Sequence, residues 1–461
     1  MVTAALRGGA GKTTLSLGLI AAWKRLGRNV AAFKKGPDFI DSAWLSLAAE
    51  RPCRNLDTFL LDSPTIQRSF GRHGEARGVS LIEGNRGLYD GMDSRGTHST
   101  AELAKLLRAP VVLVLDCGKV TRSMAAMVLG CQTLDPGVDL RGVILNQVAR
   151  ARQEQVLREA IADACRLPVL GAVPRLEDFP FPERHLGLTP PQEHRWVSRA
   201  LEKAAEAARK YLDLDALWKL AESAPDFSWE EEGGAESPLP EDSFRPAIGV
   251  VKDSAFQFYY PENLEALVDR GARVVEVSAV RERELPALDA LYIGGGFPET
   301  HAEQLADNLS FRRSLREAVE SGLPVYAECG GLMYLGESLR VGDRHYPMVG
   351  ALPVAFSMER RPQGHGYTVL EVEGENPFYP RGRSLKGHEF HYSRVLSLSE
   401  ERISFALRVR RGAGIKDQMD GIVYRNVLAT YSHIHALGCG AWAEGLVRRA
   451  MERRNPLPAA V

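Results

Sequence analysis

Cys329 has the surroundings expected of a nucleophilic cysteine. It follows an apolar run at residues 322–326 that predicts a short buried strand, and it precedes Gly330-Gly331 and further apolar residues that predict a helix. Such a sharp strand-to-helix turn lifts the side chain clear of a sheet and places the sulfur at the positive end of a helix, where a thiolate is stabilised. The alternative is that Cys329 is a small buried hydrophobic residue, the usual fate of a free cysteine.

Two other segments carry the remaining parts of a cysteine acyl-transfer site. A glycine triplet at residues 294–296 follows a predicted strand, and consecutive glycines let backbone amides approach a ligand as closely as an oxyanion hole requires. Far downstream, a β-like segment ends with a pair of histidines, His433 and His435. A thiol, amide donors and an imidazole meet only in the folded chain. We therefore predict one site with Cys329 as the nucleophile, one histidine of this pair as its base, and an oxyanion hole made by Gly295, Gly296 and Gly330.

The first residues of the chain predict a phosphate-binding loop. An apolar strand at residues 2–6 leads into Arg7-Gly8-Gly9-Ala10-Gly11-Lys12-Thr13-Thr14 and then into a helical pattern. This order places backbone amides around phosphate oxygens, Lys12 on the β- and γ-phosphates and Thr13 on Mg²⁺. Leu6 stands where the standard motif has its first glycine, so the loop matches the GGxGKT variant; a glycine turn that binds nothing is the alternative. We assign ATP binding to Gly8, Gly9, Gly11, Lys12, Thr13 and Thr14.

Polar residues follow three further predicted strands, at the ends that face the ligand in a parallel sheet. Lys35, Asp38 and Asp41 follow the strand at residues 30–33 and could bind a metal and an anionic substrate, although Gly-Pro-Asp is also an ordinary turn. Glu83 ends the next strand, where a second Mg²⁺ contact belongs. Asn146 ends a later strand and either reads the nucleotide base or caps a helix.

Strands and helices alternate in both halves of the chain, which predicts two doubly wound α/β domains. With 461 residues the chain is too long for one ordinary core. We predict an ATP-binding domain at residues 1–195 and a second domain at residues 246–461. Between them, residues 196–222 have the pattern of one amphipathic helix, and the stretch up to residue 245 is acidic and rich in Gly and Pro, as expected of a linker.

The composition is that of a soluble globular protein, with 44% hydrophobic and 25% charged residues. The 58 basic and 59 acidic residues give a net charge of −1, so no basic footprint for nucleic acid is present. No apolar run approaches the roughly 18 residues of a membrane span, and the chain enters a strand and glycine loop at once, which indicates a cytoplasmic protein without a signal peptide. The six cysteines form no CxxC pair, so neither a disulfide framework nor a zinc site is indicated.

Six motifs occur in an order that resembles one family. They are Lys35-Gly36-Pro37-Asp38-Phe39-Ile40-Asp41, Glu83-Gly84 with Gly87-Leu88-Tyr89-Asp90-Gly91, residues 294–299, Glu328-Cys329-Gly330-Gly331, Gly387-His388-Glu389-Phe390-His391-Tyr392 and Thr430-Tyr431-Ser432-His433. Over nearly the whole chain they resemble the cobyrinate a,c-diamide synthase family of glutamine-dependent amidoligases. The resemblance implies a dethiobiotin-synthetase-like, P-loop NTPase-like ATP domain followed by a flavodoxin-like class I glutamine amidotransferase domain.

The resemblance also implies roles for these residues. Cys329 would attack the carboxamide of glutamine, His433 would raise its nucleophilicity, and the ammonia would pass to the first domain. There ATP and Mg²⁺ would activate a carboxylate of a polycarboxylate tetrapyrrole, which Asp38, Asp41 and Lys35 would help to place. Many class I amidotransferases orient the histidine with a Glu two residues later, but that position is His435 here. The third group of the triad is therefore missing or supplied from elsewhere. A homodimer is one assembly that the sequence leaves open.

Three alternatives stay open. After Asp41 the family often has a Pro and then a His, whereas this chain has Ser42-Ala43-Trp44-Leu45. The macrocycle could therefore be cobyrinate, nickel-sirohydrochlorin or siroheme. Lys34, Lys35 and Arg54 could pair with its carboxylates or be ordinary surface charges. An alternative of another class is a P-loop switch ATPase with a non-catalytic C-terminal domain, although the signature lysine of that class is Arg7 here.

Overall fold

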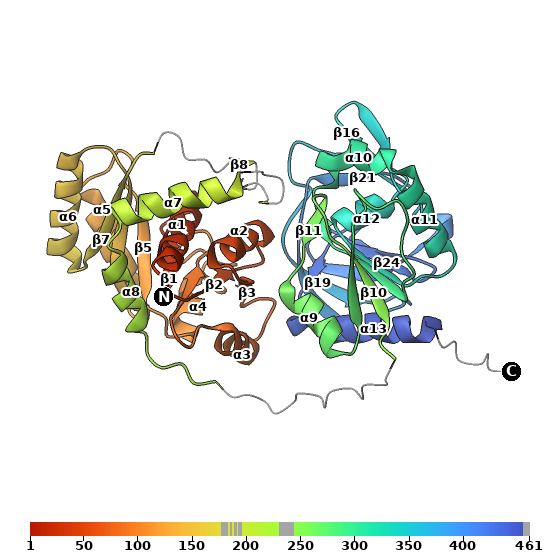
Figure 1. Ribbon diagram of the computed structural model, residues 1–461, viewed down its shortest axis with the longest axis horizontal. Coiled ribbons are helices and arrows are strands. Elements are labelled where there is room, and N and C mark those ends of the chain that lie inside the picture. The colour runs from red at the N-terminus through yellow and green to blue at the C-terminus, as the bar shows by residue number, and fades with distance from the viewer. Residues whose placement is uncertain (177–182, 185–186, 189–190, 192–195, 230–243, 455–461) are drawn as a thin grey trace. The chain divides into compact units, whose positions relative to one another are not determined.

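The chain is made of two α/β units, Met1–Glu232 and Gly233–Val461, which confirms the predicted fold class. The computed structural model describes residues 1–176, 183–184, 187–188, 191, 196–229 and 244–454 (Figure 1). The acidic stretch predicted as a linker lies mostly outside these residues.

A parallel sheet forms the centre of the first unit, in the order β3-β2-β4-β1-β5-β6-β7. Its strands are near-continuous apolar runs because helices cover both faces of the sheet; β5, for example, reads Val-Val-Leu-Val-Leu-Asp. Their bounds are β1 Val2–Ala5, β2 Val30–Lys35, β3 Arg54–Leu56, β4 Val79–Glu83, β5 Val111–Asp116, β6 Leu140–Val148 and β7 Val169–Pro174; β8 Glu183–Arg184 and β9 Gly187–Leu188 form a separate short pair.

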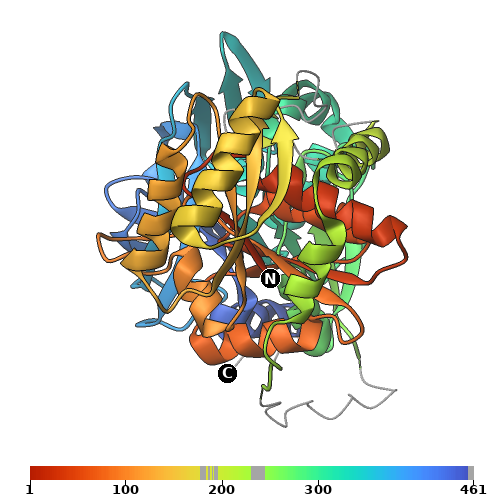
Figure 2. The same ribbon diagram turned by 90° about the vertical axis from the view of Figure 1, so that its left-hand side faces the viewer.

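Helices connect these strands and pack on one another in two groups. Helix α1 packs with α2 and α7, and α5 packs with α6. In Figure 2 the red α1 lies near the yellow-green α7 and α8, with the gold α6 on the other side of the strands. The bounds are α1 Lys12–Arg25, α2 Phe39–Ala49, α3 Ser63–His73, α4 Thr100–Leu106, α5 Ser123–Leu134, α6 Ala151–Cys165, α7 Val197–Tyr211 and α8 Leu214–Glu222.

The segment predicted as one amphipathic helix over residues 196–222 is instead divided into α7 and α8. Asp213 interrupts it, because its side chain accepts a hydrogen bond from the amide of Ala216 and so begins a new helix. Both helices belong to the first unit. The backbone of α7 passes so close to α1 that a Cβ on Gly18 would lie 2.6 Å from the carbonyl oxygen of Ala204, and Trp23 donates a hydrogen bond to the carbonyl of Leu214 at 3.1 Å.

A mixed sheet forms the centre of the second unit, in the order β12-β10-β13-β15-β24-β23-β22-β19-β20-β25. From β12 to β24 the strands are parallel, as predicted for a doubly wound domain, and from β24 onward the pairs are antiparallel, an extension that the sequence did not predict. The bounds are β10 Ala247–Val251, β12 Arg273–Val277, β13 Ala290–Ile293, β15 Val325–Glu328, β19 Gly364–Val372, β20 Ser384–His391, β22 Ser404–Arg411, β23 Met419–Tyr424, β24 Val427–Thr430 and β25 His433–Ile434.

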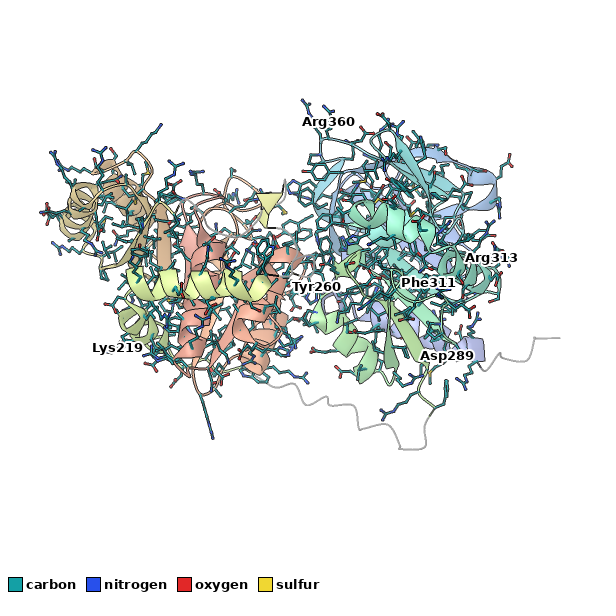
Figure 3. The ribbon with its side chains drawn as sticks, turned by 45° about the horizontal axis from the view of Figure 1, so that its top comes forward. Lys219, Tyr260, Asp289, Phe311, Arg313 and Arg360 are labelled. Carbon is teal, nitrogen blue, oxygen red and sulfur yellow. The ribbon has the colours of Figure 1, made fainter. Side chains whose placement is uncertain are left out.

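Separate apolar clusters bury the two faces of this sheet. One includes Phe311, labelled in Figure 3, and Leu332, and the other includes Leu267 and Trp442. The helices that supply these residues and their neighbours are α9 Pro261–Asp269, α10 Ala302–Asp307, α11 Leu309–Glu320, α12 Gly330–Leu335 and α13 Gly440–Arg454.

Smaller sheets complete the second unit. Strand β11, Phe256–Phe258, pairs antiparallel with β14, Gly295–Gly296. This pairing fixes the backbone of the predicted glycine loop. A side sheet has the order β17-β16-β18-β21, with bounds β16 Ser338–Val341, β17 Arg344–Pro347, β18 Val354–Met358 and β21 Ser393–Leu398.

Candidate functional site

The predicted phosphate-binding loop connects β1 to α1, as the sequence indicates. Gly11 begins the helix with a left-handed φ of 91°, and a Cβ there would lie 2.3 Å from Nδ2 of Asn146. Only glycine meets both demands. No described atom lies within 4 Å of where a Cβ would stand on Gly8 or Gly9, so that part of the loop has room for a ligand.

The first turn of α1 places Lys12 and Thr13 over the strand ends, and Thr14 continues the helix. Lys12 Nζ donates to the carbonyl of Arg86 at 2.7 Å. Burial, followed by the charge of Lys34, lowers the pKa of Lys12 to about 8. Thr13 donates through Oγ1 to Glu83 at 2.7 Å. The helix therefore directs an ammonium group and a hydroxyl toward the end of β4.

A buried lysine that the site prediction left out joins the predicted carboxylates. Lys34 Nζ lies 2.6 Å from Asp41 and 2.6 Å from Glu83, and its side chain is only 2% exposed. Burial alone would lower the pKa of Lys34, but Asp41 and Glu83 outweigh it and raise that pKa. Lys34, Lys35 and Arg54 are all buried, so the interpretation of these residues as surface charges was wrong. Successive side chains of a strand point to opposite faces of the sheet. This alternation was the signal in the sequence that Lys34 and Lys35 have different surroundings.

The same carboxylates fit a magnesium ion. Thr13 Oγ1 lies 2.7 Å from Glu83 and 3.4 Å from Asp41, so three oxygen-bearing side chains converge. The second oxygen of Glu83, Oε2, is buried and has no hydrogen-bond partner among the described residues. Hydroxyl and carboxylate oxygens are the ligands that Mg²⁺ prefers, and an unsatisfied buried oxygen is a ready position for one.

Asp38 and Lys35 have other contacts. Asp38 caps α2, because its carboxylate accepts a hydrogen bond from the amide of Asp41 at 2.8 Å. Burial and then the Asp41 carboxylate raise the pKa of Asp38 to about 7. Burial lowers the pKa of Lys35, while the charge of Asp57 acts in the opposite direction. The structure thus brings Asp41 to Thr13 and Glu83 and gives Asp38 a capping role; substrate binding by Asp38, Asp41 and Lys35 stays a prediction.

Asn146 holds the phosphate-binding loop. Its Nδ2 donates to the carbonyl of Ala10 at 2.9 Å, and the side chain is buried. Base reading by this residue stays a prediction.

In the second unit, Cys329 lies directly after β15 with an unusual backbone conformation. Its φ is 48° and its ψ is −97°, values that a residue with a side chain seldom adopts and that often mark functional sites. The amide of Cys329 donates to the carbonyl of Thr430 at 2.7 Å, which fixes the turn. The predicted strand-to-helix turn is therefore present.

The sequence predicted that the helix stabilises Cys329 as a thiolate, and this prediction was wrong for the resting protein. Burial, with a further contribution from Glu299, raises the pKa of the Cys329 thiol. Desolvation disfavours the anion more than the six-residue helix α12 and the nearby Gly330 amide favour it. The sulfur is therefore a thiol at rest, and a nearby base must remove its proton before it can attack.

The predicted glycine loop lies directly against the cysteine turn. A Cβ on Gly330 would lie 3.0 Å from the amide nitrogen of Gly296, and the amide of Gly331 donates to the carbonyl of Gly294 at 3.1 Å. The backbones of the two segments therefore touch. An oxyanion hole made by Gly295, Gly296 and Gly330 stays a prediction that this contact supports.

His433 reaches the same loop from β25. A Cβ on Gly295 would lie 2.4 Å from Cε1 and 3.2 Å from Nε2 of His433, so that edge of the ring faces the glycines. On its other side, Nδ1 lies 3.3 Å from Oε2 of Glu328. The fold thus gathers Cys329, the glycine loop and His433, which are far apart in the sequence.

The motif at residues 387–392 lies beside the histidine, a placement that the sequence could not supply. His388 pairs with His433 across β20 and β25, and their rings stack with centroids 4.9 Å apart. Burial, then the neighbouring histidines, lowers the pKa of His388 well below its ordinary value, so this ring is neutral. His391 stacks on Tyr431 at 3.6 Å, and Glu389 accepts hydrogen bonds from the amides of Ala413 and Gly414.

Comparisons with known proteins agree with the division of the chain into two units. Residues 1–188 match the model of the CobQ/CobB/MinD/ParA nucleotide binding domain, and residues 247–440 match that of the CobB/CobQ-like glutamine amidotransferase domain. A cobyrinate a,c-diamide synthase of Magnetococcus marinus is 44% identical over 97% of this chain and 96% of that protein. Proteins of the same name from Methanothermobacter thermautotrophicus and Archaeoglobus fulgidus are 42% and 41% identical, each over 96% of this chain and over 97% and 96% of their own lengths. This chain belongs to the cobyrinate a,c-diamide synthase family.

As a member of the cobyrinate a,c-diamide synthase family, the chain carries both of the predicted sites inside matched domains. The phosphate-binding loop, Glu83 and Asn146 lie in the nucleotide-binding match, and Cys329 and His433 lie in the glutamine amidotransferase match. A switch ATPase with a non-catalytic second half does not account for the second match. In the part of the chain that the structure describes, no helix has both the length and the apolar composition needed to cross a membrane.

Proposed function

We propose that this chain uses ATP and glutamine to convert the a and c acetate carboxylates of cobyrinate to amides. The observation that carries the proposal is the presence, in one member of this family, of a phosphate-binding loop beside paired carboxylates and of a cysteine–histidine–glycine cluster. The first arrangement suits activation of an acid, and the second suits release of nitrogen from an amide.

The second unit releases the nitrogen. His433 takes the thiol proton of Cys329, and the sulfur bonds to the carboxamide carbon of glutamine while the amides of Gly295, Gly296 and Gly330 stabilise the oxyanion. His433 then donates the proton to the departing nitrogen as the C–N bond breaks, which gives ammonia and a thioester. Water hydrolyses the thioester to glutamate and restores the thiol. The raised pKa of the Cys329 thiol makes this base indispensable.

The first unit activates the acid. Backbone amides of Gly8, Gly9 and Gly11 hold the phosphates of ATP, with Lys12 on the β- and γ-phosphates and Thr14 following in the helix. A substrate carboxylate attacks the γ-phosphorus and displaces ADP, which gives an acyl phosphate. Ammonia then attacks the carbonyl carbon, inorganic phosphate leaves with its bonding electrons, and loss of a proton from the nitrogen gives the amide. A carboxylate resists amines until its oxygen becomes a good leaving group, which explains the need for ATP.

Other residues of this site position the reactants. Magnesium, when bound to Thr13 and Glu83 with Asp41 alongside, would neutralise charge that develops on the phosphates. Lys34 pairs with the carboxylates of Asp41 and Glu83 and so bridges them. Asp38, Asp41 and Lys35 are assigned to placing the tetrapyrrole or the metal, and Asn146 to the nucleotide. A homodimer and a cytoplasmic location remain predictions from the sequence.

The choice of cobyrinate over nickel-sirohydrochlorin or siroheme is supported by the names of the relatives. The unusual segment after Asp41 does not oppose it. Trp44 is fully buried in α2, and Ser42 donates hydrogen bonds to the carbonyl of Asp38 at 2.7 Å and to Oδ1 of Asn55 at 3.1 Å, so both residues have a place in the fold of this unit.

The test is to offer the protein each of the three macrocycles with ATP and either glutamine or ammonium. Mass spectrometry counts the amides formed. We expect amidation of cobyrinate from both nitrogen sources, and loss of glutamine use but retention of ammonium use in Cys329→Ala. Amidation of a different macrocycle alone would overturn the substrate, and no amidation of any macrocycle would overturn the reaction.

A further inference from the structure

A buried carboxylate lies against the predicted base, although it was not part of the predicted site. Glu328 is the last residue of β15, immediately before Cys329, and is 1% exposed. Its Oε2 lies 3.3 Å from Nδ1 of His433, and its Oε1 accepts a hydrogen bond from the amide of Ile434 at 3.1 Å. One carboxylate therefore holds both the ring and the backbone of β25.

Tyr292 fixes this carboxylate from the neighbouring strand β13. Its hydroxyl donates to Oε2 of Glu328 at 3.0 Å, the same oxygen that faces His433. Burial raises the pKa of Tyr292, so the phenol remains protonated and remains a donor. Two parallel strands thus supply the parts that set the position of the Glu328 carboxylate.

The residue that occupies the usual orienting position has different partners. His435, two residues after His433, lies with its ring 4.4 Å from that of Tyr260, labelled in Figure 3, and its Nε2 is 3.8 Å from Glu262. Its Nδ1 accepts a hydrogen bond from the amide of Leu437. These contacts place His435 beside Tyr260 and α9.

Two further described neighbours of His433 carry no charge. His388 stacks on one face of the ring and is neutral, and Phe258 makes an edge contact at 6.5 Å between ring centroids. The glycine loop lies along the edge that carries Cε1 and Nε2. With Nδ1 engaged by a carboxylate, Nε2 is the nitrogen that faces the reacting side.

We propose that Glu328 is the positioning residue of the amide-hydrolysing site, in place of a carboxylate downstream of the histidine. It accepts a hydrogen bond from Nδ1–H, so that Nε2 is the nitrogen that takes the proton of the Cys329 thiol, and it stabilises the imidazolium that results. When the C–N bond of glutamine breaks, the same proton leaves with ammonia and the imidazole is neutral again. This assignment rests on the proposed function.

Glu328→Gln keeps the shape of the side chain and removes its charge. We expect kcat for glutaminase to fall about 10²–10⁴-fold, the range of a general base that loses its support, with a much smaller change in KM. Amidation from ammonium should continue at the rate of the unmodified protein, because it uses the first unit, and this continuation shows that the variant is folded.

Alkylation of Cys329 by iodoacetamide, followed by mass spectrometry of its peptide across a pH series, separates two roles of opposite sign. The Glu328 charge by itself contributes to the raised pKa of the Cys329 thiol, after burial and Glu299, and Glu389 acts in the same direction. If Glu328 acted only on the sulfur, Glu328→Gln would move the alkylation profile to lower pH. Loss of imidazolium support moves it to higher pH, which is the expected result.

A graded variant and a matched control complete the test. Tyr292→Phe leaves the Glu328 carboxylate in place but removes the hydrogen bond that the Tyr292 hydroxyl donates to it. This variant should therefore reduce glutaminase kcat by less than Glu328→Gln does. Tyr379→Phe removes another buried phenol hydrogen bond, to Tyr326 at 3.1 Å, and should leave the alkylation profile unchanged. A Glu328→Gln profile at unchanged or lower pH with normal kcat would overturn this assignment alone, whereas a wild-type protein without glutaminase would overturn the proposed function.

Discussion

Lys12 shows how a single residue can set the pH range of the first reaction. Its ammonium lies at the N-terminus of α1, where phosphate is expected, but burial and Lys34 lower its pKa to about 8. A lysine with a lowered pKa is charged below that value and becomes neutral above it. The positive charge needed for ATP is therefore present at neutral pH and lost in mild alkali.

We expect the Kd of a non-hydrolysable ATP analogue to rise about five-fold between pH 8 and pH 9, because the fraction of charged Lys12 in the free protein falls by that factor. Isothermal titration calorimetry measures it. Lys12→Arg, whose guanidinium stays charged throughout, should bind more weakly but lose this dependence. A Kd that is constant over the same range in the unmodified protein would refute the role of the Lys12 proton.

Asn146 can be tested as a loop anchor. Its Nδ2 bonds to Ala10 of the phosphate-binding loop, so Asn146→Ala should cost one buried hydrogen bond and raise KM for ATP roughly ten-fold. Because the loop holds phosphates and not the base, KM for GTP should rise by the same factor. Steady-state kinetics with both nucleotides decide the point: a selective loss of ATP preference would mean that the residue reads the base.

At the scale of elements, the close contact between α1 and α7 ties residues 197–229 to the first unit. Gly18 allows it, since any side chain there would meet the backbone of Ala204. Gly18→Ala should therefore destabilise the protein by about 1–3 kcal/mol through overpacking. Thermal and urea unfolding of the full chain measure this change.

Gly130 provides the matched control in another helix of the same unit. It lies within α5, and no described atom is within 4 Å of a Cβ placed there. Gly130→Ala should therefore stabilise by about 0.5–1 kcal/mol, because it only restricts the unfolded chain and favours helix. If Gly18→Ala were stabilising to the same extent, the packing of α7 on α1 would be in doubt.

These elements also show what the sequence could and could not predict. The phosphate-binding loop and strands β1, β2, β4, β5 and β6 were predicted because apolar runs, glycines and Lys-Thr are local signals, whereas the antiparallel half of the second sheet was not. The place of α7 was not, since an amphipathic pattern shows that a face is buried but not against which element. The contact of Glu328 with His433 joins residues 105 positions apart through the order of strands, and nothing local to either residue indicates it.

At the scale of the whole molecule, the proposed chemistry is divided between units that exchange only ammonia. Mutating one site should therefore leave the other half-reaction available. We expect Lys12→Ala to stop amidation from glutamine and from ammonium while the Cys329 site can still hydrolyse glutamine. A Lys12→Ala protein that amidates from either source would remove the phosphate-binding loop from the reaction.

Mixing two inactive variants makes this division measurable. Cys329→Ala retains the acid-activating site, and Lys12→Ala, once its glutaminase is confirmed, supplies ammonia to the solution. Together with ATP, glutamine and cobyrinate they should form amides that neither variant forms alone, because ammonia from one molecule can react with the acyl phosphate on another. An enzyme that consumes ammonium should abolish this amidation. The Cys329→Ala/Lys12→Ala double variant should form no amides when it is mixed with either single variant. Failure of the mixture, while Lys12→Ala still converts glutamine to glutamate and added ammonium still supports Cys329→Ala, would show that nitrogen does not leave the second unit in a free form.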